Sequence, residues 1–130
     1  MKTKQIGRKL TKKVIREYLR EKLSTDKKWA LHALEAIYDY QTSHEQELET
    51  TNEENGVGFS GADAEILTSF AKQYETRKYL SPKQMEIVYK KMKKYWKQVL
   101  AISNEGKLQR AMIEDGAVTK EQVFLTNLLK

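Results

Sequence analysis

Apolar residues recur every three or four positions along most of this chain, which is the spacing of one face of an α-helix. A first helix is predicted over about residues 4–23, and it is apolar on more than one side. Such a helix packs between two other elements or contacts a partner, and a homodimer is one way to cover its second side. The main apolar stripe consists of Ile6, Leu10, Val14 and Tyr18, and the second group of Ile15, Leu19 and Leu23.

Residues that cap helices indicate where the later helices begin. The Ser-Thr-Asp sequence at residues 24–26 can accept hydrogen bonds from free N–H groups, and it predicts a second helix that fades near Leu48. Ser60 can cap a third helix, in whose first turn Asp63 is favourably placed for the helix dipole.

The strongest local signal is a capping box at the start of a fourth helix. Ser81 suits the N-cap, Pro82 the first helical position, and Gln84 completes the box. The long helix that follows should end near residue 103, and a second box, Thr119 with Gln122, opens a short helix in the tail. Because no strand alternation is long enough for a sheet, the predicted fold is all-α. We expect a single compact helical bundle of about four main helices plus a short helical C-terminal tail.

The formal net charge is +6, and its distribution is uneven. Residues 1–23 carry nine basic and two acidic side chains, residues 24–76 three basic and eleven acidic, and residues 77–130 twelve basic and five acidic. We therefore expect one helical domain, 1–130, with a basic N-terminal helix, an acidic middle, and a basic long helix and tail.

Composition excludes several classes of protein. The chain contains no cysteine, which excludes disulfides and thiolate metal sites and fits a reducing cytoplasm. No apolar run approaches the roughly 20 residues that cross a bilayer, and the lysine-rich start lacks the apolar core of a signal peptide. The expected location is the cytoplasm, without a membrane partner.

Two predicted helices carry basic faces that could follow a phosphate backbone and bind it in a salt-dependent way. Four lysines of the long helix fall within about 60° of one another, near Tyr89 and Tyr95. Arginine is scarce there, which favours non-specific contact over reading of base edges. The alternative is that these lysines only keep the outer helix face soluble. The basic residues are Lys9, Lys12, Lys13, Arg16 and Arg20 in the first helix, and Lys83, Lys90, Lys94 and Lys97 in the long helix.

A glycine-rich segment separates the second and third helices. Gly56, Gly58 and Gly61 match the dinucleotide-binding pattern, but that mechanism needs a preceding strand, and the residues before Gly56 are acidic and polar. The segment is better interpreted as a tight loop docked by Val57 and Phe59. Its glycines would also allow close approach to a partner, so Gly56, Val57, Gly58 and Phe59 form a candidate partner-binding loop.

No catalytic or metal-binding set is apparent. The acidic run Glu45, Glu47, Glu49, Glu53 and Glu54 fails the calcium-loop pattern and suits a solvated face, or a mimic of nucleic-acid charge. His32 and His44 lie too far apart on one helix to share a metal. We predict a protein that is not an enzyme and that needs no cofactor and no metal.

Several short motifs between residues 29 and 103 resemble a segment of uncharacterised small proteins from bacteriophages and mobile elements. That resemblance implies work near nucleic acid or its enzymes, in a bacterial host cell, and it brings no catalytic residues. The motifs are Tyr38-x-x-Gln41-Thr42 with Glu45-Gln46, the NGVGFSGADA sequence at 55–64, Leu67-x-Ser69-Phe70-Ala71, the LSPKQ sequence at 80–84, and the Lys-Lys-x-x-Lys-Tyr run.

Two roles fit these observations. The first is a non-enzymatic phage-type protein that binds nucleic acid, or a nucleic-acid-processing complex, through its lysine-rich helix faces. The alternative is a phage-encoded inhibitor of a host defence nucleoprotein, of the anti-CRISPR or anti-restriction type, which binds by charge complementarity.

Overall fold

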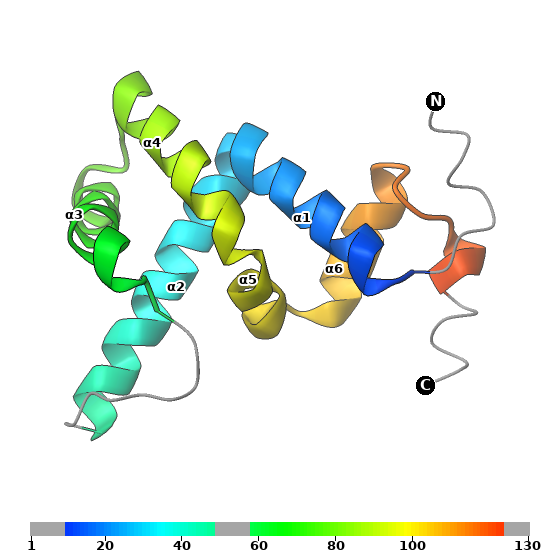
Figure 1. The fold of residues 1–130 in the computed structure, drawn as a ribbon, viewed down its shortest axis with the longest axis horizontal. Coiled ribbons are helices and arrows are strands. Elements are labelled where there is room, and N and C mark those ends of the chain that lie inside the picture. The colour runs from blue at the N-terminus through cyan, green and yellow to red at the C-terminus, as the bar shows by residue number, and fades with distance from the viewer. Residues whose placement is uncertain (1–9, 49–57, 124–130) are drawn as a thin grey trace. The chain divides into compact units, whose positions relative to one another are not determined.

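The computed structural model describes residues 10–48 and 58–123, and these are mainly helical (Figure 1). No strand occurs within those ranges, so the all-α prediction is confirmed. Between them, the described ranges contain six bounded α-helices rather than four plus a tail, because a 3-10 turn divides the long helix and the tail begins with a full helix. The elements are α1 (Lys12–Thr25), α2 (Lys27–Leu48), α3 (Gly61–Arg77), α4 (Pro82–Met92), η2 (Lys93–Tyr95), α5 (Trp96–Ile102) and α6 (Glu105–Glu114).

The chain groups into two compact units, and the division falls within α1. Residues 1–19 and 103–130 form one, here called the terminal unit, and residues 20–102 form the other, the central unit. Neither boundary coincides with the changes of charge after residues 23 and 76. The packing units are therefore not the charge segments of the sequence.

In the described part of the terminal unit, the first apolar stripe of α1 is buried. Leu10, Val14 and Tyr18 are each less than a tenth exposed, and Leu19, from the second apolar group, is fully buried. The hydroxyl of Tyr18 donates to Asp115 at 2.7 Å. The apolar residues that α6 and the tail bury in this unit are Leu108, Met112, Val118 and Val123.

The capping box predicted for the tail is present. The backbone N–H of Thr119 donates to Gln122 Oε1 at 2.6 Å, and the N–H of Gln122 donates to Thr119 Oγ1 at 3.0 Å. Phe124, Leu128 and Leu129 of the predicted tail helix lie outside the described residues.

The junction between α1 and α2 differs from the prediction in one respect. Only Asp26 caps α2, accepting from the backbone N–H groups of Lys28 and Trp29 at 3.0 and 3.3 Å. Ser24 and Thr25 belong to the last turn of α1, where their hydroxyls donate to backbone carbonyls three and four residues back. A serine or threonine inside a helix has that option as well as capping, and here Asp26 takes the cap.

Within the central unit, α2 contacts α3, α4 and α5 (Figure 1). Leu34 and Ile37 of α2 are fully buried, as are Leu67 of α3 and Val88 and Met92 of α4. Burial of side chains of this size contributes about 1.5–3 kcal/mol each, so this shared core is the main stabilising element of the unit. Leu23 at the end of α1 is also fully buried, whereas Ile15 of the same apolar group is only half-buried.

A tight turn joins α3 to α4. Lys78 ends α3 in the left-handed conformation, and its N–H donates to the Tyr74 carbonyl at 2.8 Å. The predicted capping box then opens α4: Gln84 N–H donates to Ser81 Oγ at 3.2 Å, and Ser81 N–H donates to Gln84 Oε1 at 2.8 Å. Both ends of the turn are thus satisfied by hydrogen bonds, which fixes where α4 starts.

In the part of the chain that the structure describes, no helix is both long and apolar enough to cross a lipid bilayer.

Candidate nucleic-acid interface

The α4–η2–α5 segment concentrates positive charge. Residues 82–102 contain six lysines, no arginine, and Glu86 as their one acidic residue. Five of the lysines are exposed and Lys91 is half-buried. The lysines occur as two adjacent pairs, Lys90-Lys91 and Lys93-Lys94, with Lys83 before them and Lys97 after them. Neighbouring helix positions point about 100° apart, so the members of each pair face different surroundings.

One lysine of each pair is held by a buried carboxylate. Asp63, in the first turn of α3, is 1% exposed. Its Oδ1 lies 3.0 Å from Lys91 Nζ, and its Oδ2 lies 2.7 Å from Lys94 Nζ. The hydroxyl of Tyr95 donates to Oδ2 at 2.8 Å. Asp63, Lys91, Lys94 and Tyr95 are called the Asp63 cluster below.

The environment of Asp63 keeps its carboxylate ionised. Burial by itself would raise the pKa of Asp63, but hydrogen bonds from Lys94, Tyr95 and Lys91 and the positive charge of Lys94 outweigh it. The net result is a pKa of Asp63 well below the ordinary aspartate value. In turn, the hydrogen bond to Asp63 raises the pKa of Lys94. The cluster is therefore a charged, hydrogen-bonded structural contact between α3 and the η2 region.

Sequence reasoning placed Asp63 at a helix start but missed its burial. The burial of Asp63 could have been predicted from its position on the helix. Asp63 lies on the same helix face as Leu67, Phe70 and Ala71, and all four are buried. A carboxylate in line with an apolar stripe needs a partner, and here two lysines and a tyrosine supply it. Ser60 occupies the N-cap position, as predicted, but its side chain makes no capping hydrogen bond.

The segment before α3 is fastened by side chains from three other elements. Gly58 exchanges two hydrogen bonds with the Gln98 amide, its N–H donating at 2.8 Å and its carbonyl accepting at 3.0 Å. The N–H of Phe59 donates to Gln41 Oε1 at 2.9 Å, and the N–H of Ser60 donates to the Tyr95 hydroxyl oxygen at 2.9 Å. Every N–H group of residues 58–60 is thus satisfied inside the central unit.

Glycine is required at position 58. Its φ is +151°, and an added Cβ would lie 3.0 Å from Gln41 Oε1. The ring of Phe59 is buried and meets the ring of Tyr95 edge to face at 5.8 Å. Of the candidate partner-binding loop, Gly58 and Phe59 are therefore occupied by contacts within the chain, and Gly56 and Val57 lie outside the described residues.

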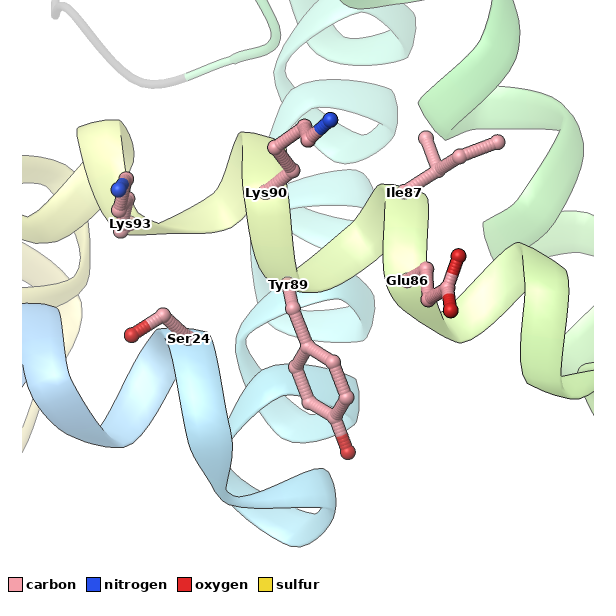
Figure 2. A pocket seen from close by; sticks show the side chains of 6 residues that line it. All are labelled: Ser24, Glu86, Ile87, Tyr89, Lys90 and Lys93. Carbon is pink, nitrogen blue, oxygen red and sulfur yellow. The ribbon is translucent and has the colours of Figure 1, made fainter.

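The other lysine of each pair lines a groove. Lys90 and Lys93 border a hollow of about 400 Å³ between the end of α1 and α4 (Figure 2). In Figure 2 the ring of Tyr89 extends from α4 beside the end of α1, whereas Lys90 leaves α4 on another side. No ion pair joins Lys90 or Lys93 to another described residue. This hollow is called the Tyr89 groove, and it is lined by Ser24, Glu86, Ile87, Tyr89, Lys90 and Lys93.

The remaining predicted basic residues occupy several positions. Lys83 and Lys97 are exposed on α4 and α5, and Lys97 Nζ lies 6.0 Å from the centre of the Trp96 ring. On α1, Lys12, Lys13 and Arg16 are exposed in the terminal unit and Arg20 in the central unit. Lys9 lies outside the described residues.

The acidic and histidine candidates add no site. Among the described residues, no three His, Cys, Asp or Glu side chains are grouped so as to hold a metal ion. His32 is exposed beside Lys28 and Glu35 in a shallow hollow. His44 and the acidic run that begins at Glu45 fall outside the part of the structure in which side chains are described.

The chain matches no family model, and comparisons with curated proteins and with solved structures found no similar protein.

Proposed function

We propose that this protein is a non-enzymatic binding protein that contacts the phosphate backbone of nucleic acid through exposed lysines of α4, η2 and α5. One observation carries the proposal: of six lysines between residues 82 and 102, Asp63 holds two, and the other four remain exposed. Compared with the residues expected from the sequence, this set replaces Lys94 with Lys93 and leaves out the five basic residues of the first helix, Lys9, Lys12, Lys13, Arg16 and Arg20. The proposed contacts are Lys83, Lys90, Lys93 and Lys97.

Charge of this kind supports binding by counterion release. Each neutralised duplex phosphate contributes about −0.9 to the slope of log K against log salt. Four contacts therefore predict a slope of roughly −3.6, and an affinity that falls about 10²-fold between 50 and 200 mM salt. The absence of arginine from residues 82–102 supports backbone contact without a preference for particular base pairs.

The test is fluorescence anisotropy with labelled DNA over a series of salt concentrations. Replacing Lys83, Lys90, Lys93 and Lys97 with glutamine should flatten the salt dependence and weaken binding at 50 mM salt by about tenfold or more. A charge-matched control replaces four exposed lysines elsewhere, Lys27, Lys28, Lys72 and Lys107, with glutamine. Equal losses in the two variants would refute a specific basic face.

The inhibitor role gives a different result in the same protein. An inhibitor of a host nucleoprotein would bind free DNA weakly in both variants, and would be retained on one nuclease-treated protein complex. That outcome would replace the proposal made here.

A further inference from the structure

We propose that the Tyr89 groove binds single-stranded nucleic acid, with an unpaired base stacked on the Tyr89 ring and the adjoining phosphates at Lys90 and Lys93. This inference rests on the proposed function and names its substrate class. The groove combines what a single strand requires: an aromatic ring, an apolar side chain in Ile87, and two lysines that form no ion pair with a described residue. Its volume, about 400 Å³, lies in the range of small-ligand sites.

The distribution of charge orients the strand. Lys90 and Lys93 lie toward one end of the groove, and Glu86 lies one helical turn before Lys90 (Figure 2). A phosphate beside Glu86 would be repelled, whereas the N–H donors of a base would find an acceptor there. Ser24 already donates its hydroxyl hydrogen to backbone carbonyls of α1, so it is not a phosphate donor. We therefore place the phosphates beside Lys90 and Lys93 and the base toward Glu86.

Reading of a duplex groove is disfavoured because the amide side chains of this stretch are already engaged. Gln84 is held in the capping box with Ser81, and Gln98 is paired with the backbone of Gly58. Residues 82–102 contain no asparagine and no arginine. The arginine and amide side chains that commonly read base edges are thus missing or occupied. A half-buried tyrosine beside lysines instead matches the stacking surfaces of single-strand binders, whose aromatic rings need an unpaired base.

The test compares a labelled oligonucleotide with its blunt duplex at 50 mM salt, measured by anisotropy. Replacing Tyr89 with leucine should weaken single-strand binding about 5- to 100-fold, because stacking on one aromatic ring accounts for a factor of that size. Y89F should stay within about twofold, because the ring remains. Neither variant should change duplex binding. The matched control is Y79L, at a tyrosine that is 55% exposed and outside the groove.

A cross-link in the unaltered protein makes the test independent of variant folding. A single strand that carries 5-bromouracil, irradiated in complex, should attach to the peptide that contains Tyr89, as identified by mass spectrometry. Attachment elsewhere, with none on that peptide, would overturn the groove assignment.

The outcomes separate this inference from the proposed function. If Y89L binds single strands normally, or if the duplex binds more tightly than the strand, the groove assignment is wrong, yet a lysine-dependent salt slope would still support the function. If K90Q/K93Q changes the binding of neither nucleic acid, both proposals fail. Retention of an acidic protein at the same lysines, without oligonucleotide binding, would also overturn both.

Discussion

Two sides of the α4–η2–α5 segment contain the same kind of residue in opposite circumstances. Lys91 and Lys94 point to the buried carboxylate of Asp63, whereas Lys90 and Lys93, each one residue earlier, border the Tyr89 groove without an ion pair to any described residue. Each side also has its own tyrosine, since Tyr95 joins the Asp63 cluster and Tyr89 lines the groove. A run of lysines thus combines a structural contact with a surface available to a ligand. The sequence of the run does not by itself show which lysines belong to which.

Of the changes considered, D63N should lower the stability of the folded protein most. The asparagine side chain has the same shape as aspartate, but it lacks the negative charge that pairs with Lys91 and Lys94 and accepts a hydrogen bond from Tyr95. We expect a loss of about 1–3 kcal/mol in the free energy of unfolding, less than for a fully buried ion pair because both lysines remain partly exposed. Urea denaturation measures it, with E65Q, an exposed carboxylate of the same helix, as a control expected to lie within about 0.5 kcal/mol of wild type. Equal stability of D63N and E65Q would contradict a structural role for the cluster.

Acid should reduce the contribution that the Asp63 cluster makes to the stability of the folded protein. The pKa of Asp63 is lower in the folded protein than in the unfolded chain, where it is about 3.9. Hence the unfolded state binds the proton more readily, and the stability from this group, fully present above about pH 5, declines as the pH falls through about 4. The urea midpoint of wild type should drop more between pH 5 and pH 3 than that of D63N. Parallel curves for the two proteins would argue against a depressed pKa.

The two tyrosines should respond differently to loss of the hydroxyl. Y95F removes a donor to Asp63 and an acceptor for the N–H of Ser60, while the ring contact with Phe59 is kept. We expect a destabilisation of about 1–2 kcal/mol, because Asp63 loses one of its hydrogen-bond donors and the N–H of Ser60 loses its acceptor. Y89F should be nearly neutral. Thermal unfolding of both variants measures the difference, and a larger shift for Y89F would reverse the roles assigned to the two sides.

The smallest effect on stability should come from the groove lysines. K90Q/K93Q removes two exposed charges that contact no described acid, so its stability should lie within about 0.5 kcal/mol of wild type. The same variant should lose nucleic-acid affinity. K91Q/K94Q should show the reverse, with lower stability and a smaller effect on binding. If the two pairs behaved alike in both measurements, the division between the sides would not exist.

Local features of this fold could be predicted from the sequence, and long-range pairings could not. The Ser81 and Thr119 boxes were predictable because each hydrogen bond spans only three residues. The assignment of Ser24 to the start of α2 was wrong because its hydroxyl also has a carbonyl in reach at the end of α1. The partners of Asp63 lie 28 and 31 positions away, and only packing of α3 against α4 brings them together.

Several of the short sequence motifs between residues 29 and 103 contribute to that long-range structure. Gln41, the residues 58–63 and Tyr95 all fall within them, and in this chain they fasten the segment before α3. These parts of the motifs therefore hold the segment before α3 in place. The Tyr89 groove could not be derived from such motifs, because it depends on how the end of α1 lies beside α4.

The fastening of residues 58–60 also has a consequence for how the protein folds. Its acceptors, Gln41, Tyr95 and Gln98, lie 18 to 40 positions away from the N–H groups they hold. Those acceptors are in place only once α2, η2 and α5 have come together, so docking of this segment should be a late step. The amide protons of Gly58, Phe59 and Ser60 would then exchange with solvent whenever that assembly loosens, and their exchange rates would report its opening, residue by residue, in native conditions.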